Sequence, residues 1–109
     1  MAIIWSKNAA DELLELVSYQ KYNVGKVPAR DVYARIKSKI ERIGANPGLG
    51  ESIPELVEIG LKHIYQLAES PWLICYKIDN KNVSILSIMD VRKDLEEMLY
   101  SKFLEGKIT

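Results

Sequence analysis

Two neighbouring apolar runs in the C-terminal half of the chain restrict its fold more than any other feature. The first runs from Trp72 to Asp79 and the second from Val83 to Met89, and both are rich in aromatic and β-branched residues, which is typical of strands. Residues 79–82, Asp-Asn-Lys-Asn, are a strong turn signal between them. We therefore expect an antiparallel hairpin. Because each run is apolar on both faces, the two strands should lie near the centre of a sheet.

The N-terminal half has the period of two helices that follow a short strand. Residues 2–5 are apolar and indicate the strand, and Ser6 is a suitable N-cap for a helix over residues 7–22. The apolar side expected for this first helix consists of Ala10, Leu13, Leu14 and Val17. The second helix begins near Pro28 and closes at Gly44, and its expected buried residues are Ala29, Tyr33, Ile36, Ile40 and Ile43. A short connection joins the two helices, which predicts an antiparallel helical hairpin.

The remaining segments complete a predicted α+β domain. Residues 44–60 are rich in glycine and proline and indicate a long loop, which should lie against the body through Leu49, Ile53 and Leu56. Residues 61–68 predict a further strand, and a final helix should follow Asp90 and end at Gly106. The order predicts a helical hairpin packed on a small antiparallel sheet, with a C-terminal helix, in one domain over residues 1–109.

Composition excludes several kinds of site. The single cysteine, Cys75, excludes an internal disulfide and any metal site built on cysteine pairs, and we expect neither a metal nor another cofactor. No apolar stretch approaches the roughly 20 residues of a membrane span, and no signal peptide is evident, so a cytoplasmic protein is expected. The formal net charge is zero. This argues against strong unassisted nucleic-acid binding and leaves protein partners open.

The residues around the predicted hairpin, together with the first residues of the chain, resemble the RelE/ParE superfamily of toxins. Many members carry a Pro-Trp-Arg-Ile-x-Tyr-Arg strand, a Val-x-x-Leu-x-Val-x-Asp strand and an Asp-x-Arg-Arg-Asp/Asn-Leu-Glu-x-x-Leu helix start. The chain has similar stretches at residues 71–77, 83–90 and 90–99. Its opening, residues 3–13, and the Pro47-Gly48-Leu49-Gly50 and Pro54-Glu55-Leu56 segments also fit the family. The order and spacing of these motifs over residues 3–103 carry the resemblance.

The resemblance implies the toxin of a type II toxin–antitoxin system, held inactive by a cognate antitoxin that wraps around it. Some members of the superfamily cleave messenger RNA on the ribosome, whereas the ParE branch poisons DNA gyrase. A third possibility is a protein that keeps the toxin fold and only binds a partner. Fold alone does not decide between these functions, because function depends on the site.

Two departures from the family pattern favour the ParE-like function. Tyr65 and Leu73 stand where arginine is common in members that cleave RNA, and arginine suits phosphate because of its fixed charge and donor geometry. If the protein were nonetheless an endoribonuclease, Arg92 and Lys93 would contact the phosphate, and Tyr65 or His63 would move the proton. The competing interpretations are that Arg92 pairs with Glu96, that Tyr65 is packing, and that His63 is a surface residue.

Two surfaces are candidates for binding a partner. Arg35, Lys39 and Arg42 form a basic stripe on the second helix, which is either a solvated face or a contact for an acidic partner or a phosphate backbone. The apolar side of the last helix, formed by Leu95, Met98, Leu99 and Phe103, either packs on the sheet or is partly covered by an antitoxin helix.

Overall fold

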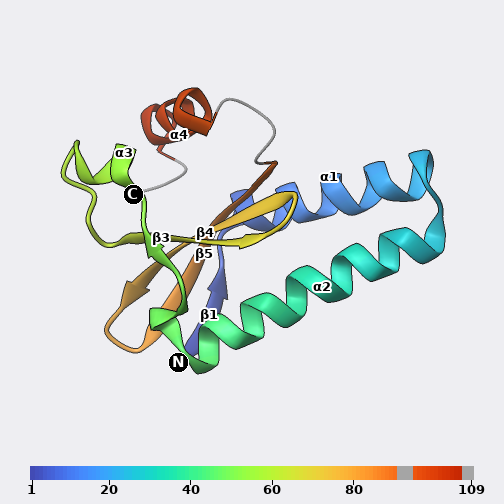
Figure 1. Ribbon diagram of the computed structural model, residues 1–109, viewed down its shortest axis with the longest axis horizontal. Helices are drawn as coiled ribbons and strands as arrows, with labels where there is room; N and C mark the ends of the chain where they lie inside the picture. Colours follow the sequence, from blue (N-terminus) through green and yellow to red (C-terminus); the bar gives the residue numbers. More distant parts are fainter. Residues whose placement is uncertain (91–94, 107–109) are drawn as a thin grey trace.

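The computed structural model describes residues 1–90 and 95–106. Its elements are strand β1 (Ala2–Trp5), helices α1 (Lys7–Asn23) and α2 (Lys26–Ala45), the 3-10 turn η1 (Pro47–Leu49), strand β2 (Glu51–Ser52), helix α3 (Pro54–Val57), strands β3 (Ile64–Glu69), β4 (Trp72–Asp79) and β5 (Asn82–Asp90), and helix α4 (Leu95–Leu104). The predicted order of strand, helical hairpin, three strands and final helix is confirmed (Figure 1).

The five strands form one sheet in the order β1-β5-β4-β3-β2. The predicted β4–β5 hairpin lies at its centre, with Trp72 opposite Asp90 and Asp79 opposite Asn82. The sheet is mixed rather than wholly antiparallel, because β1 pairs with β5 in parallel, from Ala2 opposite Asn82 to Trp5 opposite Ile85. The whole helical hairpin lies between these two strands in the sequence, and such a long crossover allows parallel pairing.

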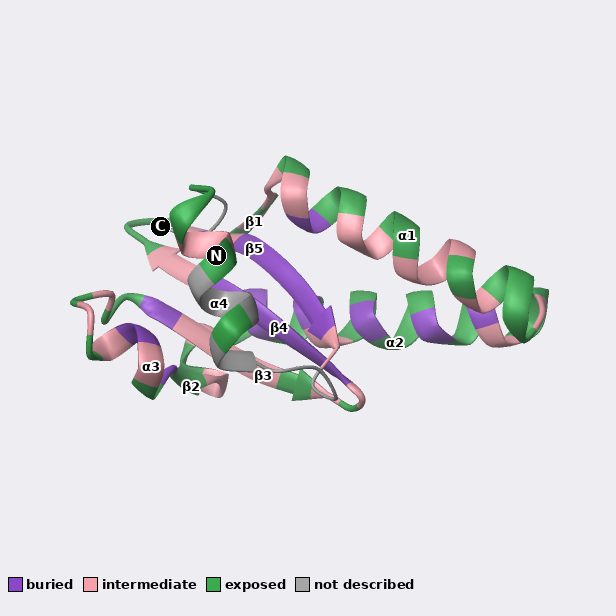
Figure 2. Ribbon diagram, turned by 90° about the horizontal axis from the view of Figure 1, so that it is seen from above, coloured by how far each residue is buried: buried purple, intermediate pink, exposed green. Residues whose placement is uncertain are grey.

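The two faces of the sheet are covered by different helices. On one face, α1 and α2 pack through Ala9, Ile36 and Ile40 against a core that includes Ile74, Tyr76 and Ile85. On the other face, Leu56 of α3 and Phe103 of α4 pack near Leu73, Cys75 and Met89. Figure 2 shows the buried strands between these helical layers. The central strands are apolar on both faces, as predicted, because each face has its own core.

The orientation of α1 differs from the prediction by about one residue. Ser6 is the N-cap, as expected, and its hydroxyl accepts a hydrogen bond from the Ala9 N–H at 3.0 Å. Ala9, Leu13 and Leu16 face the core, whereas the predicted Ala10 and Leu14 are exposed. Both sets have helical spacing, so the periodicity alone does not decide which one is buried.

Helix α2 and the segment after it are more ordered than the sequence predicts. Val32 is buried where Tyr33 was expected, and Tyr33 is 44% exposed. Gly44 lies within α2 rather than after it. The segment expected as a long loop contains η1, β2 and α3, and Ile53 and Leu56 are buried in it, as expected. Strand β3 begins at Ile64, three residues later than predicted.

Candidate functional site

The side chains of Tyr65 and Leu73 both pack against other residues of the fold. These are the positions at which RNA-cleaving relatives commonly carry arginine. The ring of Tyr65 stacks on that of Tyr76, with centroids 5.7 Å apart, on the face covered by α1 and α2. Leu73 is only 6% exposed and belongs to the core on the opposite face. Tyr65 and Leu73 therefore lie on opposite faces of the sheet.

Of the other residues proposed for RNA cleavage, the structure describes only His63. His63 is exposed in the turn before β3. Arg92 and Lys93 lie outside the described residues.

Two residues of the basic stripe on α2, Arg35 and Lys39, form ion pairs with Glu69, whereas Arg42 does not. The Arg35 guanidinium donates to Glu69 Oε2 at 2.8 Å and to the Ser70 carbonyl at 3.0 Å, and it lies 5.5 Å from the centre of the Trp72 ring. Lys39 Nζ is 3.5 Å from Glu69 Oε1. These contacts attach α2 to the β3–β4 turn. Arg35 and Lys39 are thus partly neutralised by one carboxylate, which leaves less of their charge for a partner.

Arg42 is the member of the stripe that remains available. It is exposed and lines a pocket of about 290 Å³ together with Ala34, Arg35, Ser38, Lys39 and Glu69. Helix α2 as a whole carries six basic and two acidic residues in a chain whose net charge is zero. Its outer surface is therefore the basic surface of a neutral protein, which suits an acidic partner.

The candidate surface on α4 is described only in part. Phe103 is half-buried against the core that contains Leu73 and Cys75. The backbone of residues 95–104 forms the helix, but the side chains of Leu95, Met98 and Leu99 lie outside what the structure describes. The alternative of an antitoxin contact by these three residues stays a prediction.

A partly buried polar network around Glu12 joins α4 to α1 and β5, and the sequence analysis did not predict it. Glu12 Oε1 accepts hydrogen bonds from Ser87 Oγ at 2.8 Å, from Asn8 Nδ2 at 2.7 Å and from the Ile88 N–H at 3.3 Å. Glu12 Oε2 is 2.7 Å from Lys102 Nζ, with side chains 18% and 15% exposed. Lys102 lies 90 residues from Glu12 in the sequence, so no local sequence pattern predicts that the two residues form an ion pair.

This network also closes one edge of the sheet. Strand β1 pairs with β5 only as far as Ile85. Beyond that point, the Leu86 carbonyl accepts hydrogen bonds from Ser6 Oγ at 3.2 Å and from Asn8 Nδ2 at 2.9 Å. The Ile88 N–H donates to the Glu12 carboxylate. The polar side chains at the start of α1 thus satisfy backbone groups of the central strand, which would otherwise be costly to bury.

The hydroxyl of Tyr76 holds the segment after α2 against the sheet. It donates to the Pro47 carbonyl at 2.8 Å and accepts from the Gly50 N–H at 2.9 Å. Burial raises the pKa of Tyr76 above its usual value, and the hydrogen bond from Gly50 opposes that rise. A Cβ on residue 50 would lie 2.5 Å from both this hydroxyl and the Gln66 carbonyl oxygen.

Gly50→Ala is expected to lower the free energy of unfolding by about 2 kcal/mol, because the added methyl group overpacks a site closed by backbone and a buried ring. Urea denaturation followed by tryptophan fluorescence measures the effect. Gly48→Ala is the control in the same segment, since its Cβ would meet only Asn46 Oδ1, at 3.6 Å, and should change stability by less than about 0.5 kcal/mol. Equal effects of the two substitutions would contradict the packing described here.

Two classes of site are not found in the described part of the chain. No three His, Cys, Asp or Glu side chains within residues 1–90 and 95–106 gather closely enough to hold a metal ion. Among the same residues, no helix combines the length and the apolar character needed to cross a membrane.

Comparison with known proteins gives one family and one fold. Residues 3–95 match the family described as the ParE toxin of the type II toxin–antitoxin system parDE. Among solved structures, the chain is similar to a chain of a chromosomal ParDE toxin–antitoxin system from P. aeruginosa, with a TM-score of 0.67 and 17% sequence identity, covering 83% of this chain and 95% of that one. No curated protein matches at a significant level. The structural likeness supports the fold, and the family match covers most of the sequence.

Proposed function

The chain belongs to the ParE toxins of type II toxin–antitoxin systems, and we propose that it arrests bacterial growth by poisoning DNA gyrase while a cognate antitoxin holds it inactive. Membership of the family indicates that the protein is a toxin and that a cognate antitoxin neutralises it. The choice of gyrase over messenger RNA rests on the residues of this chain.

The observation that carries this choice is the packing of Tyr65 and Leu73. An endoribonuclease of this superfamily must stabilise charge on a phosphate and protonate a leaving oxygen. Tyr65 stacks on Tyr76 and Leu73 lies in the core, on opposite faces of the sheet. Neither position offers a cation to a phosphate. A non-nucleolytic mechanism needs only a binding surface, and the exposed side of α2 around Arg42 is suited to one.

We assign Arg42 a contact with a protein partner, and we expect the same of Arg92, which lies outside the described residues. Arg42 is exposed and, unlike Arg35 and Lys39, is not paired with Glu69. Arginine is well suited to pairing with carboxylates because of its planar donor geometry. Arg35 and Lys39 act mainly by fixing α2 to the β3–β4 turn through Glu69.

The test is inducible expression in a bacterial host, with pulse labelling of DNA and protein synthesis and a supercoiling and DNA-cleavage assay with purified gyrase. We expect growth to stop, DNA synthesis to fall first and cleaved DNA to accumulate with gyrase. If protein synthesis stops first, with cut messages, the gyrase target is wrong. Growth that continues in the presence of folded protein would indicate a toxin fold kept for partner binding alone.

Arg42→Glu is expected to weaken growth inhibition or its neutralisation by about tenfold, since reversing a charge at an interface replaces attraction with repulsion. The measurement is the inducer concentration that halves the growth rate, with and without the antitoxin. Lys81→Glu, an exposed reversal in the β4–β5 turn, is the matched control and should behave like the wild type. If both variants are indistinguishable from the wild type, Arg42 is a solvated residue.

A further inference from the structure

The helical hairpin extends beyond the sheet and exposes apolar side chains there. Figure 1 shows the distal parts of α1 and α2 with no strand beside them. Six of the nine large hydrophobic side chains exposed in the described part of the chain lie between residues 14 and 33. The exposed fraction reaches 88% for Tyr22 and 74% for Val27. Large apolar side chains gathered on one exposed segment indicate an interaction surface.

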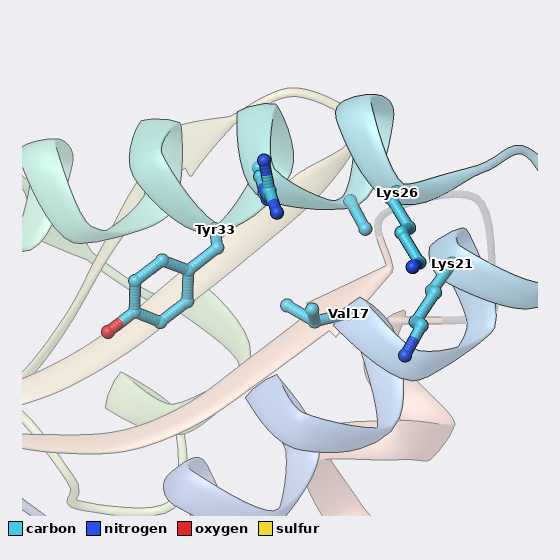
Figure 3. Close-up of a pocket in the computed structure, with 6 residues that line it drawn as sticks. Val17, Lys21, Lys26 and Tyr33 are labelled. Atoms are coloured by element: carbon cyan, nitrogen blue, oxygen red, sulfur yellow. The ribbon is translucent and has the colours of Figure 1, made fainter.

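A pocket opens between the two helices on this part of the hairpin. Its volume is about 400 Å³, and it is lined by Val17, Lys21, Lys26, Ala29, Arg30 and Tyr33. Val17 lies on α1 between the helices, Tyr33 lies farther along α2, and the ammonium groups of Lys21 and Lys26 lie near each other (Figure 3). We call this site the hairpin pocket. It combines an apolar floor with a cationic rim.

The cations of the rim have no acidic partner in the described structure. None of the residues lining the hairpin pocket is acidic, and the one carboxylate between residues 17 and 33, that of Asp31, lies 3.9 Å from Arg35. Lys26 and Arg30 are four residues apart on one helix, a spacing at which like charges destabilise it. The charges therefore oppose helix stability, and a bound carboxylate would relieve their repulsion.

The chemistry of the pocket identifies its occupant as an acidic protein segment. A second copy of this chain would bring three cations against three cations if the same surfaces met, which is repulsive. Nucleic acid would neutralise the cations but would leave the valines of the hairpin end, Val24 and Val27, against water or phosphate. An amphipathic helix with an apolar side chain and neighbouring carboxylates matches both the floor and the rim.

We propose that the hairpin pocket is a docking site for the antitoxin, which inserts an apolar side chain of an acidic amphipathic helix between α1 and α2 and places carboxylates against Lys21, Lys26 and Arg30. This inference rests on the proposed function in that it assumes a cognate antitoxin. It does not depend on gyrase being the target.

The test uses the full-length toxin and the purified antitoxin that restores growth when the two are co-expressed. Lys26→Glu/Arg30→Glu is expected to weaken antitoxin binding by at least about tenfold in calorimetry, and the loss should shrink at high ionic strength because salt screens exposed charges. Tyr33→Ala removes part of the apolar wall and should weaken binding severalfold at both ionic strengths. Lys62→Glu/Lys81→Glu makes the same change of net charge at exposed residues away from the hairpin and should bind like the wild type.

Growth inhibition by each variant, measured without antitoxin, separates the possible occupants. The proposal is supported if Lys26→Glu/Arg30→Glu remains toxic and is no longer neutralised. The proposal is overturned if the variant binds the antitoxin as tightly as the wild type does. Loss of toxicity with unchanged antitoxin affinity would indicate that the surface contacts the target instead, and loss of duplex-DNA binding would indicate a nucleic-acid surface. If the wild type arrests growth without affecting gyrase, the proposed target is wrong. The docking site is still supported in that case, provided that the antitoxin does not neutralise Lys26→Glu/Arg30→Glu.

Discussion

Replacing Glu12 with alanine is expected to lower the free energy of unfolding by about 3 kcal/mol, because it leaves a nearly buried ammonium group and three other donors without this acceptor. Lys102 Nζ, Ser87 Oγ and the Ile88 N–H all direct their hydrogen bonds to this carboxylate. Ser87 is fully buried, so water does not readily replace the lost acceptor. The value is at the lower end of the range for breaking a buried pair, since both charged side chains keep some contact with solvent.

Urea denaturation, followed by the fluorescence of Trp5 and Trp72, measures this loss. Glu15→Ala is the matched control, because it removes an exposed carboxylate from the same helix and should cost less than about 0.5 kcal/mol. Lys102→Ala and the double variant complete a cycle that isolates the pair. A coupling energy near zero would mean that Lys102 does not hold α4 against α1.

Raising the pH from 9 to 12 is expected to remove about 3 kcal/mol of stability through Cys75 alone, since each unit of pH between the two pKa values costs up to about 1.4 kcal/mol. Burial raises the pKa of this thiol from 9.0 to about 12, with a further rise from the Glu12 carboxylate and a smaller opposing effect of Lys102. Between these two values the unfolded chain releases the thiol proton while the folded chain keeps it. The unfolded state then binds fewer protons, so stability falls as the pH rises, and Cys75 contributes no pH dependence below about 8.

Cys75→Ala separates this effect from the titration of lysines and tyrosines, which is common to both proteins. The variant should be the less stable protein at pH 7, because it leaves a small cavity in the core. The difference should shrink steadily above pH 9 and then reverse. Stability curves that stay parallel from pH 7 to 11 would show that the thiol is not buried as described.

Local patterns in the sequence were enough to predict most elements of the fold. The aromatic and β-branched runs on either side of residues 79–82 predict the β4–β5 hairpin, and the structure confirms it. Ser6 predicts the start of α1 because an N-cap acts on an N–H only three residues away. The family motifs, which are read in order along the chain, predict the toxin family that the match over residues 3–95 shows.

The candidate site was predicted less well, because it depends on which side chains meet across the fold. Arg35 was expected to form a continuous stripe with Lys39 and Arg42, but it binds Glu69, which is 34 residues away. The exposed apolar end of the helical hairpin was not predicted at all. Tyr33 has the spacing of a buried residue in α2, and only the path of the helix beyond the sheet leaves it exposed.

The sequence by itself determined the order of the longer helices and strands, their approximate bounds and the family, because periodicity, caps and turns act between residues that are close along the chain. Tertiary structure alone decided which side of α1 is buried, that Tyr65 and Leu73 lie on opposite faces, and that Lys102 pairs with Glu12. The physical reason is that helical spacing defines several equivalent faces, and strand alternation does not say which face a given helix covers. Only the packing of elements far apart in the sequence selects one arrangement, by burying apolar surface while giving each buried polar group a partner.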